Sequence, residues 1–285
     1  MKRISILFLL TGALLYMQQT KGQFIFNGDS IPPKDSSHVI TGDDTSHVDW
    51  TTQYIVAKGW SVMDTGRFKI ADQALAMARR GAIVDAQRNL LEQIEGMRIV
   101  GETTVKDCVA QKDYIYARLD GIIKGAELYG DPLINGNTIE VQMRVPIYKD
   151  KGGVADVMQK AINVKPVKPN SNVLVGDTES VAFTVNGKEF DPAVFPQIFD
   201  EKGNLVLDFS KYYDAENGKI PKYLKLSREI LDLAGYEKGT RVIDLIQNSD
   251  GTLRVNPEKL TGDKVNWEKV RNIVTKIGGI FLMLF

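Results

Sequence analysis

The stretch from Ala71 to Val105 decides the fold, and it reads A-D-Q-A-L-A-M-A-R-R-G-A-I-V-D-A-Q-R-N-L-L-E-Q-I-E-G-M-R-I-V-G-E-T-T-V. Small and apolar residues recur in it at the three-to-four spacing of one buried helical face. These positions are Ala71, Leu75, Ala78, Ala82, Ala86, Leu90, Ile94 and Met97. Because half of them are Ala, the helix can lie close against a flat partner, most simply a sheet. The sequence therefore predicts a long helix that ends at Gly96 and packs on a sheet.

Strand patterns flank this helix. The other elements expected in this half are a strand at 54–64, a strand at 98–106, a short helix at 112–119, a hairpin at 125–148 and a short helix at 152–163. The hairpin is centred on Asn135-Gly136, a dipeptide suited to a tight turn. Apolar and polar residues alternate from Ile139 to Ile147, which gives one buried and one solvated face. The order predicts an α+β domain over 50–163, in which the long helix covers one face of a largely antiparallel sheet.

A second, smaller α+β domain is expected over 181–285, after a linker at 164–180 that contains two prolines. Its expected elements are strands at 181–185, 195–199 and 205–209, a turn at 200–204, a helix at 224–233, a strand at 241–247, a turn at 250–251, a helix at 263–276 and a buried final strand at 280–285.

The N-terminus has the order of a secretory signal peptide. Lys2-Arg3 precedes an apolar run from Ile4 to Met17, and a short polar stretch follows. The small residue Gly22 makes cleavage before Gln23 the expected site. The alternative is an uncleaved anchor, but the run is shorter than the roughly 20 apolar residues that span a bilayer. We therefore expect an exported, periplasmic or otherwise extracytoplasmic bacterial protein, without a membrane span in the mature chain.

Composition limits the partners. Removal of residues 1–22 takes away Lys2, Arg3 and Lys21 and no acid, so 33 of the 36 basic residues remain against 36 acidic ones, a net charge of −3. A near-neutral balance without a basic run argues against nucleic acid as a partner. The single cysteine, Cys108, cannot form an intramolecular disulfide, and we interpret it as a small buried hydrophobe rather than a nucleophile.

Residues 23–49 are polar and are interpreted as a flexible lead-in. They contain a near-repeat, Asp35-Ser-Ser-His38-Val39 and Asp44-Thr-Ser-His47-Val48, which holds both histidines of the chain. A weak metal site or a strand-like docking segment is the alternative, but a mobile segment lacks the fixed geometry that a tight metal site needs.

The signatures of common enzymes are absent from the sequence. It has no glycine-rich phosphate loop, no G-x-S-x-G, no H-E-x-x-H and no paired-cysteine metal site. The segment from Asn248 to Gly251 resembles part of a calcium loop, but Ile246 and Pro257 would occupy ligand positions that need carboxylates, so we interpret it as a turn. The sequence therefore indicates no catalytic residue, no cofactor and no metal.

Several conspicuous side chains receive structural interpretations. Charged residues on the long helix are expected on its solvated side: Arg79, Arg80, Arg88, Glu92 and Glu95. Trp50 and Trp60 flank the first strand and are expected in the core or at its rim rather than as a ligand platform.

One family resemblance follows from these residues. The pattern Ala78-Arg79-x-x-Ala82-x-x-Asp85-Ala86-x-Arg88-Asn89-Leu90-Leu91-Glu92-x-Ile94-x-Gly96-Met97-x-Ile99, then Thr103-Thr104-Val105-Lys106-Asp107, resembles the bacterial membrane-associated lipoprotein family. That family shares its domain with the N-terminal domain of the flagellar assembly protein FlgT. Gly125-Ala126 and the strand from Val141 to Ile147 match its closing hairpin, so the resemblance covers about 54–148. Residues 192–203 are similar to a segment downstream of this domain in larger exported relatives.

The resemblance implies a non-catalytic envelope protein, sometimes a ring component around the flagellar motor and sometimes associated with the outer membrane. This chain lacks the lipidated cysteine of the lipoprotein members. We therefore expect a structural, assembly or protein-binding component of the envelope, not an enzyme, whose partners are other envelope proteins or further copies of itself. The alternatives are a periplasmic carrier of a small ligand and a secreted hydrolase with convergent carboxylates.

The first prediction concerns export. The mature protein is expected to begin near Gln23 and to be released from cells by disruption of the outer membrane, because the N-terminal run has the signal-peptide order. Intact-mass measurement of the purified native protein checks this, and retention of residues 1–22 would refute it.

Overall fold

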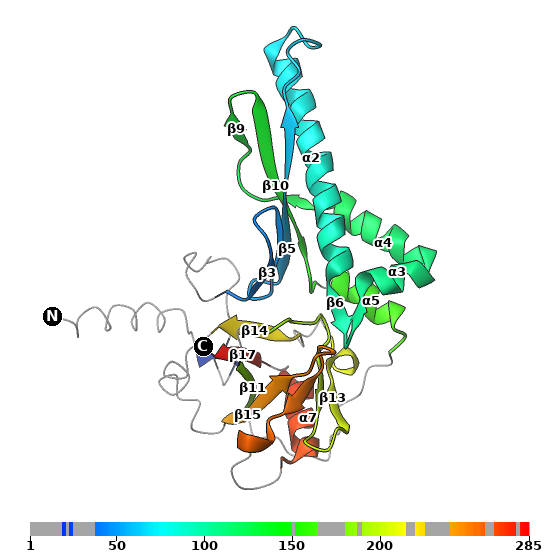
Figure 1. Cartoon of the computed structure of the whole chain (residues 1–285), viewed down its shortest axis with the longest axis vertical. Helices are drawn as coiled ribbons and strands as arrows, with labels where there is room; N and C mark the ends of the chain where they lie inside the picture. Colours follow the sequence, from blue (N-terminus) through cyan, green and yellow to red (C-terminus); the bar gives the residue numbers. More distant parts are fainter. Residues whose placement is uncertain are drawn as a thin grey trace, which may run out of the picture.

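The computed structural model describes residues 19–20, 23–24, 38–149, 152–164, 180–186, 190–214, 220–225, 240–259, 265–277 and 280–284. The apolar run of the predicted signal peptide and all but the ends of the predicted linker lie outside these residues. The described part is a mixed α+β structure with a long helix on an antiparallel sheet and a second sheet beyond it, as predicted (Figure 1). Two short strands, β1 (Gln19–Thr20) and β2 (Gln23–Phe24), pair with each other.

The first sheet has the strand order β3-β4-β5-β10-β8, and β9 also pairs with β10; every pairing is antiparallel. The strands are β3 (Ile40–Gly42), β4 (Ser46–Asp49), β5 (Tyr54–Val62), β8 (Glu127–Leu128), β9 (Leu133–Asn135) and β10 (Thr138–Pro146). The predicted hairpin is confirmed, but its turn lies one residue later than expected. Asn135 ends β9 and pairs with Thr138, so the two turn residues are Gly136, with a positive φ of 58°, and Asn137. The predicted alternation is confirmed, since the odd-numbered residues Ile139, Val141, Met143 and Val145 are buried.

Helix α2 (Ala71–Gly96) lies close to this sheet because small residues face each other at the contact. A Cβ atom at Gly59 of β5 would clash with the carbonyl oxygen of Ala82 and the amide nitrogen of Ala86. The backbones of helix and strand therefore meet directly at this point. Closely packed interiors tolerate little added volume, so larger side chains at Gly59, Ala82 or Ala86 would not fit between the helix and the strand.

The predicted buried face of α2 is confirmed from Ala78 to Met97 and wrong at its start. Ala71 is exposed and Leu75 is only half-buried, whereas Ala74 is buried. The buried side consists of Ala74, Ala78, Ala82, Ala86, Leu90 and Ile94. The buried residues keep a spacing of four along the whole helix, and each step of four residues rotates the side chain by about 40° around the helix axis. Continued from Ala78 toward the N-terminus, this spacing reaches Ala74 rather than Leu75.

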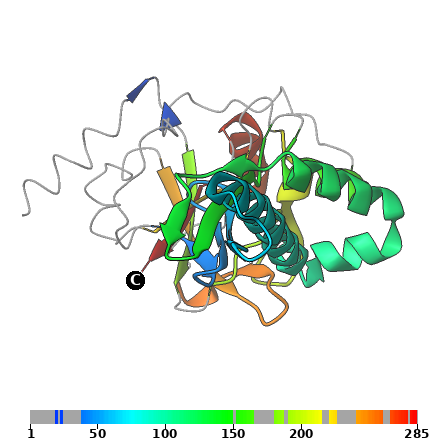
Figure 2. The same cartoon turned by 90° about the horizontal axis from the view of Figure 1, so that it is seen from above.

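A small hairpin and three helices complete this half: β6 (Arg98–Val100), β7 (Thr103–Thr104), α3 (Val105–Gln111), α4 (Asp113–Lys124) and α5 (Val154–Ala161). Helices α3 and α4 project to one side of α2 (Figure 2). The single strand predicted at 98–106 is wrong, because the chain turns at Gly101 and α3 begins at Val105. Thr104 and Asp107 form a capping box: the Asp107 carboxylate accepts the Thr104 amide at 2.7 Å, and Thr104 Oγ1 accepts the Asp107 amide at 3.4 Å.

Residues 38–49 are not part of a flexible lead-in, and this expectation is corrected for them. They form β3 and β4, and the side chains of Val39 and Val48 are buried in the core. His38 Nδ1 lies 2.7 Å from Asp49 Oδ2 and ties the start of the segment to its end. The strand-like alternative is therefore the observed one, because each copy of the polar near-repeat carries one valine that the core needs. Residues 25–37 lie outside the described residues.

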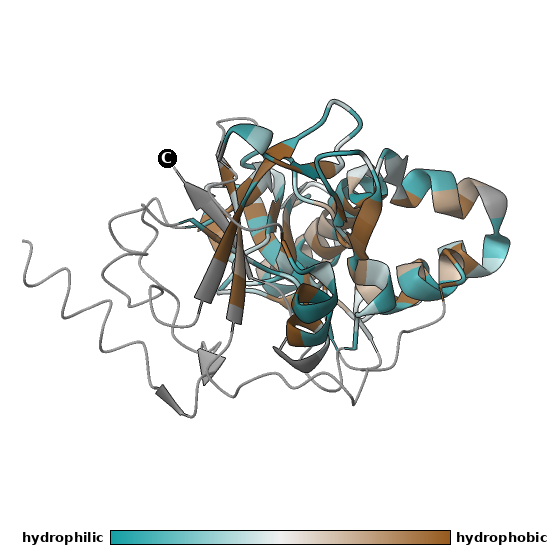
Figure 3. Cartoon of the chain, turned by 90° about the horizontal axis from the view of Figure 1, so that it is seen from below, coloured by the Kyte–Doolittle hydropathy of each residue, from teal (hydrophilic) through white to brown (hydrophobic). Residues whose placement is uncertain are grey.

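The second sheet is mixed, with the strand order β13-β12-β16-β15-β11-β17-β14. Its strands are β11 (Ser180–Asn186), β12 (Gln197–Phe199), β13 (Leu205–Asp208), β14 (Lys222–Lys225), β15 (Thr240–Gln247), β16 (Leu253–Val255) and β17 (Ile280–Leu284). The central strand β11 is parallel to β15 and β17. Figure 3 shows apolar residues along much of β11 and β15. Helix α7 (Trp267–Ile277) contacts β11 and β13, and two short 3-10 turns lie at Phe209–Lys211 and Pro257–Lys259.

One helix prediction in this half is wrong at its start. Leu224 belongs to β14, because Lys222, Tyr223, Leu224 and Lys225 adopt extended backbone and pair with β17. The remainder of the helix predicted at 224–233 lies outside the described residues. The predicted turns are confirmed at Gly203 and Gly251, which have positive φ angles of 82° and 77°.

The two sheets are joined through residues 190–195, which we call the strap. The amide of Val194 donates to the carbonyl oxygen of Arg98 at 2.9 Å, and the amide of Phe195 donates to that of Ile99 at 2.8 Å. The strap thus continues the backbone bonding of β6 into the second half, and the buried side chains of both halves form one core.

Two buried tyrosines hold the strap from opposite halves. Tyr148 Oη donates to the Val194 carbonyl at 2.8 Å, and Tyr223 Oη donates to the Ala193 carbonyl at 2.6 Å. Burial raises the pKa of both phenols, so both stay protonated and remain donors. The ring of Trp50 meets that of Tyr223 edge to face at 5.4 Å, which confirms Trp50 as a core residue.

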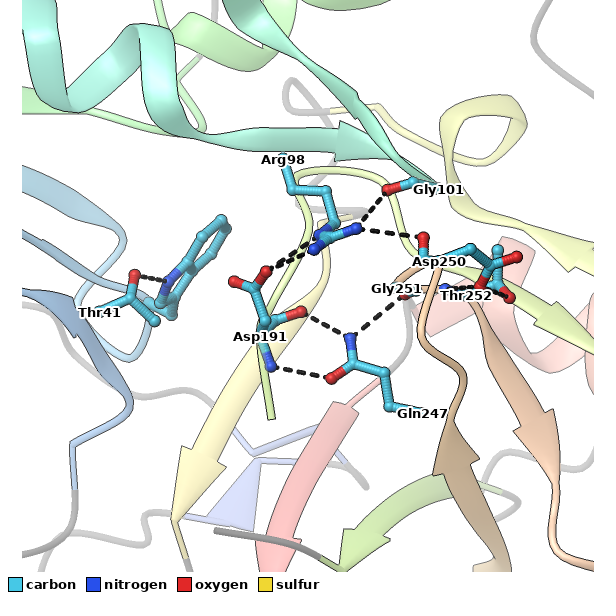
Figure 4. A network of polar contacts seen from close by, with 9 residues as sticks. Thr41, Arg98, Gly101, Asp191, Gln247, Asp250, Gly251 and Thr252 are labelled. Atoms are coloured by element: carbon cyan, nitrogen blue, oxygen red, sulfur yellow. Dashed lines mark hydrogen bonds and ion pairs between the residues drawn. The ribbon is translucent and has the colours of Figure 1, made fainter. Parts of the chain in front are cut away.

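A polar network closes the same junction at its surface (Figure 4). Arg98 donates to the Asp191 carboxylate through Nη2 at 2.7 Å and Nε at 3.0 Å, and Nη1 donates to the carbonyl oxygens of Gly101 and Asp250. The side-chain amide of Gln247 accepts the Asp191 amide and donates to its carbonyl oxygen. These bonds use several of the five guanidinium donors and fix β6 to the turn after β15.

Substitution at the helix contact tests the packing of α2. Ala82→Leu is expected to lower the free energy of unfolding by roughly 1–3 kcal/mol, because the added side chain has no space against β5. Ala76→Leu is the matched control, since Ala76 is exposed on the same helix. Chemical denaturation of both variants measures the difference, and equal losses would show that the wrong side of α2 has been assigned to the contact.

Substitution of one strap tyrosine tests the junction. Tyr223→Phe is expected to cost about 1–3 kcal/mol, because it leaves the buried Ala193 carbonyl without its donor. Tyr116→Phe is the control, since Tyr116 is exposed on α4. If calorimetric unfolding gives the two variants the same stability, the Tyr223 hydroxyl does not hold the strap.

Candidate functional site

The first sheet has one covered face and one open face. Among the described helices, α2 alone packs along β5 and β10. Ile55, Ala57 and Gly59 of β5 lie on the α2 side, so the even-numbered residues point the other way. We call the side chains that point away from α2 the open face: Tyr54, Val56, Lys58, Trp60 and Val62 of β5, Thr138, Glu140, Gln142 and Arg144 of β10, His47 of β4, Glu127 of β8, Tyr129 after β8 and Leu133 of β9. Trp60, Val62, Glu127 and Leu133 are exposed, Val56 is buried, and the others are half-buried.

The pairing register places these side chains in rows across the strands. One row runs from His47 through Val56 and Arg144 to Glu127. The row toward the end of β5 contains Trp60, Glu140 and Leu133. Side chains directly opposite each other on neighbouring strands lie within contact distance, so each row is a continuous strip.

Arg144 is the most constrained charge on the open face. Its Cζ lies 4.4 Å from the ring centroid of Tyr54 and 5.0 Å from that of Tyr129. Its Nη2 is 3.4 Å from Glu127 Oε2, and its buried Nε has no acceptor within the described part of the chain. Each ring adds about 0.5–1 kcal/mol of cation–π attraction at an exposed site. The guanidinium is therefore held in one place, with donor capacity left for another molecule.

The other end of the open face is apolar. Trp60 is 42 % exposed, Val62 63 % and Leu133 60 %. The amide of Trp60 donates to Asp85 Oδ2 of α2 at 3.0 Å, so the backbone beneath the indole is fixed to the helix. Trp60 is thus an exposed side chain on a rigid support, at the rim rather than in the core.

The two histidines lie in different surroundings. His38 pairs with Asp49, whereas His47 lies on the open face, where burial lowers its pKa and favours the neutral imidazole. Within the described ranges, no group of three or more His, Cys, Asp or Glu side chains is placed to hold a metal ion.

Cys108 is buried in α3, as predicted, and burial raises the pKa of its thiol, with the nearby Asp107 carboxylate as a further cause. The thiol form therefore prevails at neutral pH, which suits a packing residue. The charged side chains of α2 at Arg79, Arg80, Arg88 and Glu92 are exposed as predicted, and Glu95 is half-buried.

Carboxylates at the junction of the two halves are engaged in structural bonds. Asp191 pairs with Arg98, and Asp250 accepts the amide and hydroxyl of Thr252. Asp200 accepts the amides of Lys202 and Asn204 and shapes the predicted turn at 200–204. Their role in this structure is to fix turns and the junction.

No protein-family model and no curated protein matches the chain. Within the described residues, no helix combines the length and hydropathy that a bilayer span requires.

Proposed function

We propose that the protein is an exported, non-catalytic component of the bacterial cell envelope that acts by binding other envelope proteins. The open face is the proposed contact surface. The signal-peptide order of the N-terminus supports export, and the resemblance of 54–148 to the membrane-associated lipoprotein family supports a structural or assembly role. The observation that carries the proposal is the constrained Arg144–Tyr54–Tyr129 cluster beside exposed Trp60.

This composition is typical of protein interfaces. Trp, Tyr and Arg are the residues most enriched among those that dominate binding energy, and charged side chains at rims add specificity. On the open face the row that contains Arg144 and the row that contains Trp60 are separated by one row, which consists of Lys58 and Gln142. An isolated exposed apolar residue needs no explanation, but a contiguous set of aromatic, apolar and ordered cationic side chains indicates an interaction site.

The open face is also prepared for binding before a partner arrives. β5 and β10 pair along nine residues each, and α2 contacts both from the covered side. Arg144 already occupies its place between two rings, so little side-chain entropy remains to be lost. A preorganised surface of this kind retains more of its contact energy as affinity.

Site-specific photo-crosslinking in native cells tests the proposal. A photoreactive amino acid at Gln142 is expected to give discrete adducts with one or a few envelope proteins, because Gln142 lies between Lys58 and Tyr129 in the open face. The same amino acid at Val84, which is 57 % exposed on α2, is the control and is expected to give none of these adducts.

Alanine substitutions test whether Arg144 and Trp60 themselves bind the crosslinked partner or merely lie near it. Arg144→Ala and Trp60→Ala are each expected to weaken the adducts at least tenfold, the loss of a binding hot spot of about 1.4 kcal/mol or more. Arg88→Ala, an exposed arginine of α2, is expected to leave them unchanged. Adducts that form equally from Val84, or that survive both open-face substitutions in folded protein, would contradict the proposal.

A further inference from the structure

The end of the molecule farthest from the second sheet carries an apolar and basic tip. The tip consists of residues 62–80, which include the end of β5, the following loop and the first turns of α2, together with 133–137 of the neighbouring hairpin. Gly81 lies opposite Ser61, since a Cβ at Gly81 would stand 2.6 Å from Ser61 Oγ. The helix N-terminal to Gly81 therefore rises about 15 Å past the end of the strand, as Figure 1 shows at the top.

The large apolar side chains of the tip are unusually exposed. Ile70 at 65 %, Val62 at 63 % and Leu133 at 60 % are the three most exposed of those described, and Ile134 follows at 57 %. The register places Val62 opposite Thr138, next to Asn135, so the strand end and the hairpin lie side by side. Val62 and Leu133 lie on the open face, Ile134 lies on the other face of the hairpin, and Ile70 lies at the start of α2, so apolar side chains occur on more than one side of this end.

Basic residues surround these apolar side chains. The exposed charges of the tip are Arg67, Lys69, Arg79 and Arg80 against Asp64 and Asp72. The Asp64 carboxylate accepts the Arg67 amide at 2.9 Å and is thereby engaged. The tip is thus net positive on a chain whose formal charge is zero, which favours an anionic partner.

We propose that the tip docks on the surface of an anionic lipid bilayer. A protein partner would need a matching hollow for each projecting side chain, whereas the interfacial region of a bilayer accepts aliphatic groups of any arrangement. Aliphatic side chains among Lys and Arg form the pattern of interfacial membrane binding. Trp60 lies two positions before Val62 on the same strand face and is 42 % exposed, so its indole can report on contact near Val62. Val62 and Leu133 also belong to the open face, so the test of this inference rests on Ile70, which lies outside that face.

Vesicle binding of the purified mature chain tests the inference. Co-sedimentation is expected with vesicles that contain phosphatidylglycerol, with at least tenfold weaker binding to pure phosphatidylcholine and at raised salt. Emission from Trp60 is expected to shift to the blue on binding, because Trp60 is exposed, whereas Trp50 is buried and Trp267 is packed against the core. Trp60→Phe should remove the shift.

Two matched substitutions locate the contact. Ile70→Asp is expected to reduce vesicle binding at least tenfold, and it threatens the fold little because Ile70 is the N-cap of α2, where Asp is favoured. Val84→Asp introduces the same change at a similarly exposed position about 20 Å along the helix, and it is expected to bind as the unaltered chain does. Failure of the unaltered chain to bind anionic vesicles, or an equal loss in both variants, would overturn the inference. Self-association that Ile70→Asp abolishes, without vesicle binding, would assign the tip to a second copy of the chain instead.

Discussion

The rest of the structure depends on the direct contact between the backbone of α2 and that of β5. Gly59 provides no side chain, and Ala82 and Ala86 provide the smallest ones available, so helix and strand approach closely over the middle of the sheet. This contact commits one face of β5 and β10 to the helix. Because side chains alternate between the two faces of a strand, every second residue of β5 and β10 points away from α2. Arg144 and Trp60 are among these residues and can contact other molecules.

The strap gives this open face a fixed support. Residues 190–195 belong to the second half by sequence, yet their amides bond to β6, and Tyr148 and Tyr223 hold their carbonyl oxygens from the two halves. Because the buried side chains form one core, the first sheet does not stand alone on a hinge.

Local patterns predicted the elements that depend on local physics. The spacing of Ala and Leu gave the bounds of α2, and Asn135-Gly136 with the alternation after it gave the β9–β10 hairpin. The helix after Thr104 was missed although T-x-x-D is a capping-box pattern, because the β-branched residues Thr103, Thr104 and Val105 favour a strand. The segment around His47 has the polar composition of a lead-in, because only Val39 and Val48 in it are buried apolar residues. The burial of these two valines depends on strand pairing within the sheet, which the composition does not reveal.

The candidate site could be predicted only in part. The alternation of β10 shows that Glu140, Gln142 and Arg144 share a face, but it does not show which face the helix covers. The position of Arg144 between Tyr54 and Tyr129 depends on the register of β10 with β5, which is distant in sequence, and no local pattern in β10 encodes that register. Exposure of Trp60 likewise follows from which elements pack where, not from the strand pattern that contains it.

The central claim is that the open face is covered by another protein in the envelope and uncovered in the isolated chain. Cysteine labelling measures this directly, with Gln142→Cys and Val84→Cys each placed in a Cys108→Ser background. In purified protein both cysteines are expected to react with a hydrophilic maleimide, the half-buried one at 142 more slowly than the exposed one at 84, and these rates are the reference. In intact envelopes the cysteine at 142 is expected to be protected at least tenfold while the one at 84 still reacts. Envelope rates that equal the reference rates at both positions would contradict the account.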